Sequence, residues 1–313
     1  TARGEGATYL VGMERGWPSE LLSQIRVTDL RANPGNLYPE PVEIEGASLT
    51  TRLKLDPFEL TLGEISFDDQ GRHLVLNGQL EARPDGWALA LDGQMDRLSP
   101  QRLLQLWPEP LKDKTRAWIR ENVIDADLQN LDLAVRQTPG RRPDLFLGFD
   151  FSGLKTRFMK GMPPIEEGAG HGALYDNRFA IIADSGFVTA PQGGRVDISG
   201  SSFIIPSVAI KRGPARVQLK TASTITAALA LLDADPLGLL KKAGQPVTLA
   251  DGRAVVDGQL DFLLKPQLQT DEVAFDMRAV ARDVRSRQLV KGRVLVAPLL
   301  EIVAKNGLLK ITG

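Results

Sequence analysis

The stretch Phe58–Leu80, FELTLGEISFDDQGRHLVLNGQL, shows the pattern on which the predicted fold depends. Apolar side chains alternate with polar ones on both sides of an Asp-Asp-Gln-Gly turn, as in Phe58, Leu60 and Leu62. A period of two places the apolar side chains on one face of a strand and the polar ones on the other. Two such strands joined by a short turn predict an antiparallel hairpin with one apolar face.

The same alternation extends through most of the chain. It runs from Ala7 to Gln94, and shorter strands follow from Leu128 to Lys220 and from Pro246 to Val296. Successive hairpins in a meander are the simplest topology for this pattern. The apolar face of such a sheet requires a cover, which leaves two predictions open: a closed β-sandwich or barrel, or an elongated, twisted antiparallel groove whose apolar lining holds acyl chains.

Two helical insertions interrupt the strands, at about 98–123 and 223–243. In the first, LSPQRLLQLWPEPLKDKTRAWIRENV, Ser99 is a predicted helix cap followed by proline, and a second helix is expected near Pro110. In the second, Ser223 or Thr224 is the predicted cap, and Gly244 ends a short second helix. We expect the first insertion to act as a plug or cap against the apolar face, with its basic residues in solvent. Its predicted contact residues are Leu103, Leu104, Trp107, Trp118 and Ile119.

The composition limits the possible functions. The 313 residues include 38 Lys and Arg against 39 Asp and Glu, so there is no electrostatic reason to expect nucleic acid as a partner. Cysteine is absent, which excludes thiol chemistry within this sequence and suits an oxidising compartment. The chain opens within a strand pattern and ends directly after apolar residues. We therefore expect a fragment of a longer protein, forming one continuous unit over residues 1–313.

The sequence contains no arrangement of catalytic or metal-binding residues, so we expect neither an enzyme nor a bound cofactor. The two histidines, His73 and His171, are far apart and are expected at the surface. The glycine-rich run 168–172 lacks the spacing of a phosphate-binding loop and is expected to allow close packing. The carboxylate pairs are predicted to be solvated turn residues or helix caps rather than acid–base pairs. These pairs are Asp68/Asp69, Glu166/Glu167 and Asp233/Asp235.

Three passages resemble a known family. The segment LSPQRLLQLWPEPLKDKTRAWIREN (98–122) is similar to the helical passage of the large AsmA-like proteins of the YhdP type, where a proline-broken segment precedes an R-x-W-[IL] helix. The segments RVDISGSSFIIPS (195–207) and 221–266 are similar to its short strands and to its next helical break with the returning strand. The matching residues are Arg116, Trp118 and Ile119 in the first segment, and Leu232, Pro236, Leu237, Gly258 and Leu260 in the last.

This resemblance implies a section of a bridge-like lipid transfer protein of the Gram-negative envelope. Such a protein carries phospholipids through the periplasm along a hydrophobic β-groove between the inner and outer membranes. It implies an inner-membrane anchor outside this fragment, and outer-membrane or envelope proteins as partners. The alternatives are an envelope scaffold that binds proteins at exposed sheet edges and a carbohydrate-active enzyme. The predicted groove-lining residues are Leu60, Leu62, Leu74, Leu76, Trp87, Leu89, Leu147, Phe149, Ile181 and Leu260.

Overall fold

The computed structural model describes residues 1–33, 35, 37–38, 40–69, 71–266, 268–289, 292–305 and 307–313. Over these residues the chain is mainly β, and the 17 strands found there belong to one antiparallel sheet with two helical insertions, which confirms the predicted fold class. The strands are β1 (Arg3–Glu14), β2 (Trp17–Ala32), β3 (Val42–Leu55), β4 (Phe58–Asp69), β5 (Arg72–Arg83), β6 (Gly86–Leu98), β7 (Val123–Gln137), β8 (Asp144–Thr156), β9 (Ile165–Tyr175), β10 (Arg178–Thr189), β11 (Arg195–Asp197), β12 (Ser202–Ile205), β13 (Pro214–Thr224), β14 (Asp251–Leu263), β15 (Ala274–Ser286), β16 (Leu295–Lys305) and β17 (Leu308–Thr312).

Both helical insertions lie where the sequence predicts them. Ser99 Oγ accepts a hydrogen bond from Arg102 N at 3.3 Å, and Thr224 Oγ1 accepts one from Ala227 N at 3.1 Å. These side-chain caps satisfy backbone donors that the first turn of a helix leaves unpaired. Among the described helices, none combines the length and apolarity needed to cross a bilayer. The helices are α1 (Pro100–Leu106), α2 (Asp113–Asn122), α3 (Ile225–Asp233), α4 (Leu239–Lys242) and the 3₁₀ turn η2 (Thr270–Glu272).

Contacts group the chain into two compact units. Unit 1 comprises Thr1–Glu121, Asp127–Asp150 and Ala173–Asn177, and unit 2 comprises the remaining ranges Asn122–Ala126, Phe151–Gly172 and Arg178–Gly313. Strands β7, β8 and β9 contribute residues to both. The expectation of one continuous unit stays a prediction.

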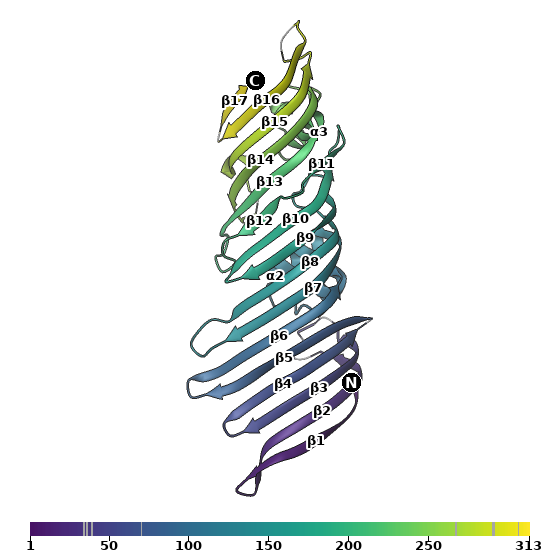
Figure 1. Cartoon of the computed structure of the whole chain (residues 1–313), viewed down its shortest axis with the longest axis vertical. Helices are drawn as coiled ribbons and strands as arrows, with labels where there is room; N and C mark the ends of the chain where they lie inside the picture. The colour runs from purple at the N-terminus through teal and green to yellow at the C-terminus, as the bar shows by residue number, and fades with distance from the viewer. Residues whose placement is uncertain are drawn as a thin grey trace. The chain divides into compact units, whose positions relative to one another are not determined.

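Strand register in unit 1 places the apolar side chains on a common face. Figure 1 shows β1 to β6 side by side in sequence order. Residues directly opposite one another on paired strands point to the same side of a sheet. Four cross-strand rows of β2 to β7 follow from the pairings: Val27–Ala47–Phe67–Leu74–Met95–Leu131, Ile25–Leu49–Ile65–Leu76–Gly93–Leu133, Ser23–Thr51–Leu62–Gly78–Leu91–Val135 and Leu21–Leu53–Leu60–Leu80–Leu89–Gln137. We call this surface the unit-1 apolar face.

A β-bulge at Gly63 keeps β4 in phase with its neighbours. Leu62 and Ile65 are three residues apart, so a regular strand would put them on opposite faces. Thr50 pairs with Glu64 while Thr51 pairs with Leu62, which leaves Gly63 as the extra residue. The bulge therefore returns Ile65 and the residues that follow it to the unit-1 apolar face.

The opposite face of unit 1 is polar and carries ion pairs between neighbouring strands. Arg136 Nη2 lies 2.7 Å from Asp92 Oδ1, and Lys54 Nζ lies 3.1 Å from Glu59 Oε2.

Unit 2 also has a row of apolar side chains across its strands, and a helix covers one end of this face. Its central row is Ile181–Phe203–Val217–Leu260–Phe275. Helix α3 lies on the same face, because Ile225 packs against the buried cluster of Ala250, Ala281 and Val284, and Ala281 pairs with Ala254 on β14. A second cluster of buried residues joins α3 to the β10–β11 hairpin: Ala190, Val196, Ala227 and Ala230. Helix α3 is therefore an apolar plug at one end of this face.

Candidate functional site

The unit-1 apolar face is the candidate functional site. Six of the residues predicted to line a groove lie on it, spread over three adjacent strands. Leu60 pairs with Leu80, which pairs with Leu89, and Leu62, Leu74 and Leu76 occupy the other three rows. Trp87 follows by alternation from Leu89 on β6 and pairs with Ala82. The register therefore brings together Leu60, Leu62, Leu74, Leu76, Trp87 and Leu89.

The remaining predicted lining residues lie on other strands. Ile181 of β10 and Leu260 of β14 belong to the same cross-strand row of unit 2, linked through Phe203 and Val217. Leu147 and Phe149 share one side of β8 and alternate with Asp150, whose Oδ2 accepts a hydrogen bond from Asn130 Nδ2 at 2.8 Å. Ile181 and Leu260 therefore lie on one face of unit 2, and Leu147 and Phe149 lie on one face of β8.

These side chains are only partly removed from water. Trp87 is 54% exposed, and the other nine predicted lining residues are half-buried. In a closed sandwich, residues at the centre of such rows would be buried. Contiguous exposed apolar patches are uncommon on folded proteins and often mark interaction sites, so this face is taken as the candidate site.

A buried ion pair fixes α1 to the end of the sheet. Arg102 Nε lies 2.7 Å from Asp69 Oδ2, and Arg102 Nη2 lies 2.8 Å from Asp69 Oδ1 and 2.6 Å from the Glu43 carbonyl oxygen. Arg102 Nη1 also donates to Gln105 Oε1 at 2.9 Å. Both charged residues are 8% exposed, so the prediction that Asp69 is a solvated turn residue is wrong. Its carboxylate is buried because it pairs with a guanidinium that arrives from a helix.

The predicted contact residues of the helical insertion are not its most buried part. Leu103, Leu104, Trp107 and Ile119 are half-buried, and Trp118 is 49% exposed. The buried residues of α1 are Pro100 and Arg102, and α2 has none. Contact of these apolar residues with the face therefore stays a prediction.

The sequence predicts that the basic residues of the first helical insertion lie in solvent, but Arg116 of α2 does not. Its side chain is 13% exposed. It donates from Nη2 to the Leu104 carbonyl at 3.0 Å and from Nε to the Trp107 carbonyl at 3.3 Å. These carbonyls lie at the C-terminal end of α1, where the helix leaves acceptors unpaired and favours a cation. Arg116 therefore joins the two helices of the insertion.

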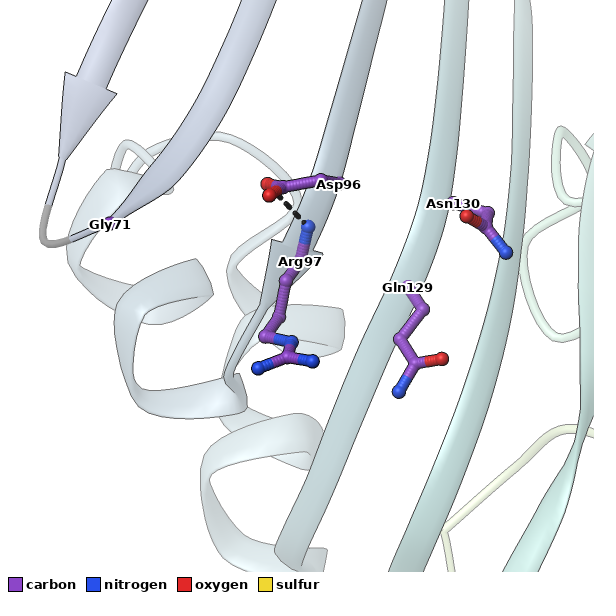
Figure 2. A pocket seen from close by; sticks show the side chains of 5 residues that line it. All are labelled: Gly71, Asp96, Arg97, Gln129 and Asn130. Carbon is purple, nitrogen blue, oxygen red and sulfur yellow. Dashed lines mark hydrogen bonds between the residues drawn. The ribbon is translucent and has the colours of Figure 1, made fainter.

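Unit 1 also contains a polar hollow. Figure 2 shows its lining, which consists of Gly71, Asp96, Arg97, Gln129 and Asn130. Asp96 Oδ1 accepts hydrogen bonds from His73 N at 3.0 Å and from Arg97 N at 2.8 Å. The side chains of Gln129 and Asn130 bond to neighbouring carboxylates, with Gln129 Nε2 donating to Asp127 Oδ2 at 3.0 Å and Asn130 Nδ2 donating to Asp150 Oδ2 at 2.8 Å.

The two histidines lie beside different aspartates at the surface. His73 Nδ1 lies 3.0 Å from Asp68 Oδ1, and His171 Nδ1 lies 3.2 Å from Asp184 Oδ2. Asp233 Oδ1 accepts a hydrogen bond from the backbone of Lys241 at the start of α4. Within the part of the chain that the structure describes, no three histidine or acidic side chains are grouped to hold a metal ion.

Ion pairs on the polar face shift two glutamate pKa values. The hydrogen bond from Arg52 lowers the pKa of Glu20, and the hydrogen bond from Lys54 lowers the pKa of Glu59. Both carboxylates are therefore ionised at neutral pH. The ionised Glu20 and Glu59 side chains keep the polar face charged and solvated, while the opposite face is apolar.

Comparison with known proteins gives no relative from which a function can be transferred. The chain has no significant match to a protein-family model, to a curated protein or to a solved structure.

Proposed function

We propose that this chain is a periplasmic section of a lipid-transfer bridge, in which the apolar face of the sheet carries phospholipid acyl chains. The observation that supports this proposal is the register of β2 to β7, which aligns apolar rows across six strands and leaves them half-exposed. The resemblance to the AsmA-like proteins supplies the envelope setting, including an inner-membrane anchor outside this fragment and envelope proteins as partners.

The physical basis of carriage is the replacement of water by hydrocarbon on the apolar face. Each Å² of apolar area removed from water contributes about 25 cal/mol. Leucine or another aliphatic side chain recurs in every row, as in Leu74, Leu76, Leu80 and Leu91. Successive positions of an acyl chain from one strand to the next therefore have similar free energies, and movement between them requires no chemical step.

The test is to place charge on either side of one strand. In the apolar-face variant, Leu74→Asp and Leu76→Asp are combined on β5. The matched control combines Val75→Asp and Asn77→Asp, since Val75 pairs with Ser66 and Gln94 on the polar face. Both variants add two carboxylates to the same strand. Photocrosslinking to a phospholipid with a reactive group in its acyl chain, together with native mass spectrometry, reports binding.

We expect the apolar-face variant to lose lipid crosslinking and the control to retain it. Equal crosslinking of both variants would show that the wrong face was chosen. A wild-type protein that carries and crosslinks no phospholipid would reject lipid carriage. Stable co-purification of one envelope protein with such a lipid-free chain would favour the scaffold alternative instead.

A further inference from the structure

The two edges of the unit-1 apolar face differ in chemistry. One edge is formed by the β1–β2, β3–β4 and β5–β6 turns, at residues 15–16, 56–57 and 84–85, and we call it the hairpin edge. The other edge contains the β4–β5 turn and the start of α1, and we call it the helix edge. In an antiparallel meander alternate turns lie on the same side, as Figure 1 shows for these strands.

The hairpin edge carries exposed aromatic side chains next to the apolar rows. Phe58 and Trp87 lie in edge-to-face contact with ring centroids 5.3 Å apart. Both follow by alternation from the apolar row that contains Leu60 and Leu89. Trp17, at the tip of the β1–β2 hairpin, is 77% exposed. The aromatic rings therefore stand where the apolar surface meets water.

The indole N–H groups at this edge are available as donors. Within the described residues, neither Trp17 nor Trp87 has a hydrogen-bond partner for its Nε1. At the helix edge, by contrast, Trp107 Nε1 donates to the Leu111 carbonyl and Tyr38 Oη donates to the Leu106 carbonyl at 3.3 Å. The polar atoms of the helix-edge aromatics are thus already used by the protein.

The helix edge is charged and occupied by protein. The buried Arg102–Asp69 pair lies there, and Arg72 Nη1 lies 3.7 Å from Asp69 Oδ2. Tryptophan with a free N–H is the side chain that prefers the boundary between hydrocarbon and the glycerol–headgroup region of a lipid. An acyl terminus has no polar atom to match such a donor.

From this asymmetry we infer that a bound phospholipid lies with its glycerol and headgroup at the hairpin edge, beside Trp87, and with its acyl chains directed toward the helix edge. This inference rests on the proposed lipid carriage and adds the polarity of the bound molecule. The face is wide enough, because Trp87 and Met95 are eight residues apart on β6, or about 26 Å, whereas the hydrocarbon of one bilayer leaflet is about 15 Å thick.

Depth-dependent quenching of tryptophan fluorescence tests the orientation. One variant retains Trp87 as its single tryptophan through Trp17→Phe, Trp107→Phe and Trp118→Phe. The matched variant adds Met95→Trp and Trp87→Phe, which moves the single indole to the far end of the same strand and face. Each is incubated with phosphatidylcholine vesicles containing phosphatidylcholine with a nitroxide either near the glycerol or at the acyl methyl end. Protein is then separated from the vesicles by gel filtration.

We expect Trp87 to lose more fluorescence with the nitroxide near the glycerol, and the Met95→Trp variant to lose more with the nitroxide at the methyl end. The reverse order, or equal losses at both positions, would overturn the orientation while leaving lipid carriage intact. Absence of quenching in both variants with both labels, with far-ultraviolet circular dichroism unchanged, would overturn the proposed function together with the orientation.

Discussion

Arg102 of α1 and Asp69 at the end of β4 form a two-point ion pair, with Nε–Oδ2 and Nη2–Oδ1 distances of 2.7 and 2.8 Å, and both residues are buried. The pair anchors a short helix through charge, whereas α3 is anchored through apolar packing of its Ala227 and Ala230 with Ala190 and Val196. The two helical insertions therefore resemble each other in sequence layout but differ in how the sheet holds them.

Substituting Arg102→Met should destabilise the α1 segment strongly. Removing one partner leaves the Asp69 carboxylate buried without its counter-ion, which typically costs about 3–5 kcal/mol. Urea unfolding measures the total loss, and hydrogen exchange over residues 98–106 shows whether it is local. The control is Arg31→Gln, because the Arg31–Glu43 pair is exposed and such pairs contribute at most about 1 kcal/mol. Similar losses in both variants would contradict a special role for the buried pair.

Stability should fall in acid partly through the polar face. The pKa values of Glu20 and Glu59 are lowered in the folded state by Arg52 and Lys54, so these ion pairs stabilise the fold above the ordinary glutamate pKa of 4.5. Their contribution is lost as the pH falls below 4.5 through the folded-state values. The variant Glu20→Gln with Glu59→Gln should show a shallower loss of unfolding free energy below pH 4.5. An unchanged slope in urea titrations would exclude these two groups as its source.

The packing of α3 against the loop at Gly193 should be disrupted by a single methyl group added at that glycine. This glycine has a φ of +84°, and a Cβ added there would lie 2.4 Å from Ala227 N in the first turn of α3. Gly193→Ala should therefore add a clash to backbone strain and increase hydrogen exchange over residues 225–233. The neighbouring Gly194 has a φ of +96° with no atom near its Cβ position, so Gly194→Ala isolates the strain. Equal effects of the two substitutions would indicate that the contact is unimportant.

Phospholipid should raise the stability of the wild-type chain and have little effect on the variant with Leu74→Asp and Leu76→Asp. A ligand present at one hundred times its Kd adds about 2.7 kcal/mol to the unfolding free energy when it binds only the native state. Thermal unfolding followed by circular dichroism, with and without a short-chain phosphatidylcholine, measures this difference. An equal rise in both proteins would point to binding away from the unit-1 apolar face.

The features that depend on local sequence could be predicted, and those that depend on distant partners could not. Alternation at Leu74 and Leu76 reports which side chains share a face, and the Ser99 and Thr224 caps follow from residues within one turn. Nothing near Arg102 indicates its burial, because its partner Asp69 lies 33 residues away. Arg116 is similar, since the carbonyls that it binds belong to another helix.

The pairing scheme likewise decided which predicted lining residues share a surface. Alternation assigned Ile181 and Leu260 to faces of separate strands, but only the register of β10, β12, β13 and β14 places them in one row. The chemical difference between the hairpin edge and the helix edge also required the structure, because Trp87 appears in the sequence only as one of the alternating apolar residues.

The bulge at Gly63 also indicates how a sheet of this kind tolerates a change in length. Deleting Gly63 would leave FELTLEISF, in which Phe58, Leu60, Leu62, Ile65 and Phe67 alternate without interruption. Deleting Ser66 would instead move Phe67 to the polar face and interrupt the cross-strand row that contains it. At this position of β4 one residue can therefore be gained or lost without moving the following side chains to the opposite face of the sheet. The local bend of the strand can thus change while the cross-strand apolar rows stay continuous.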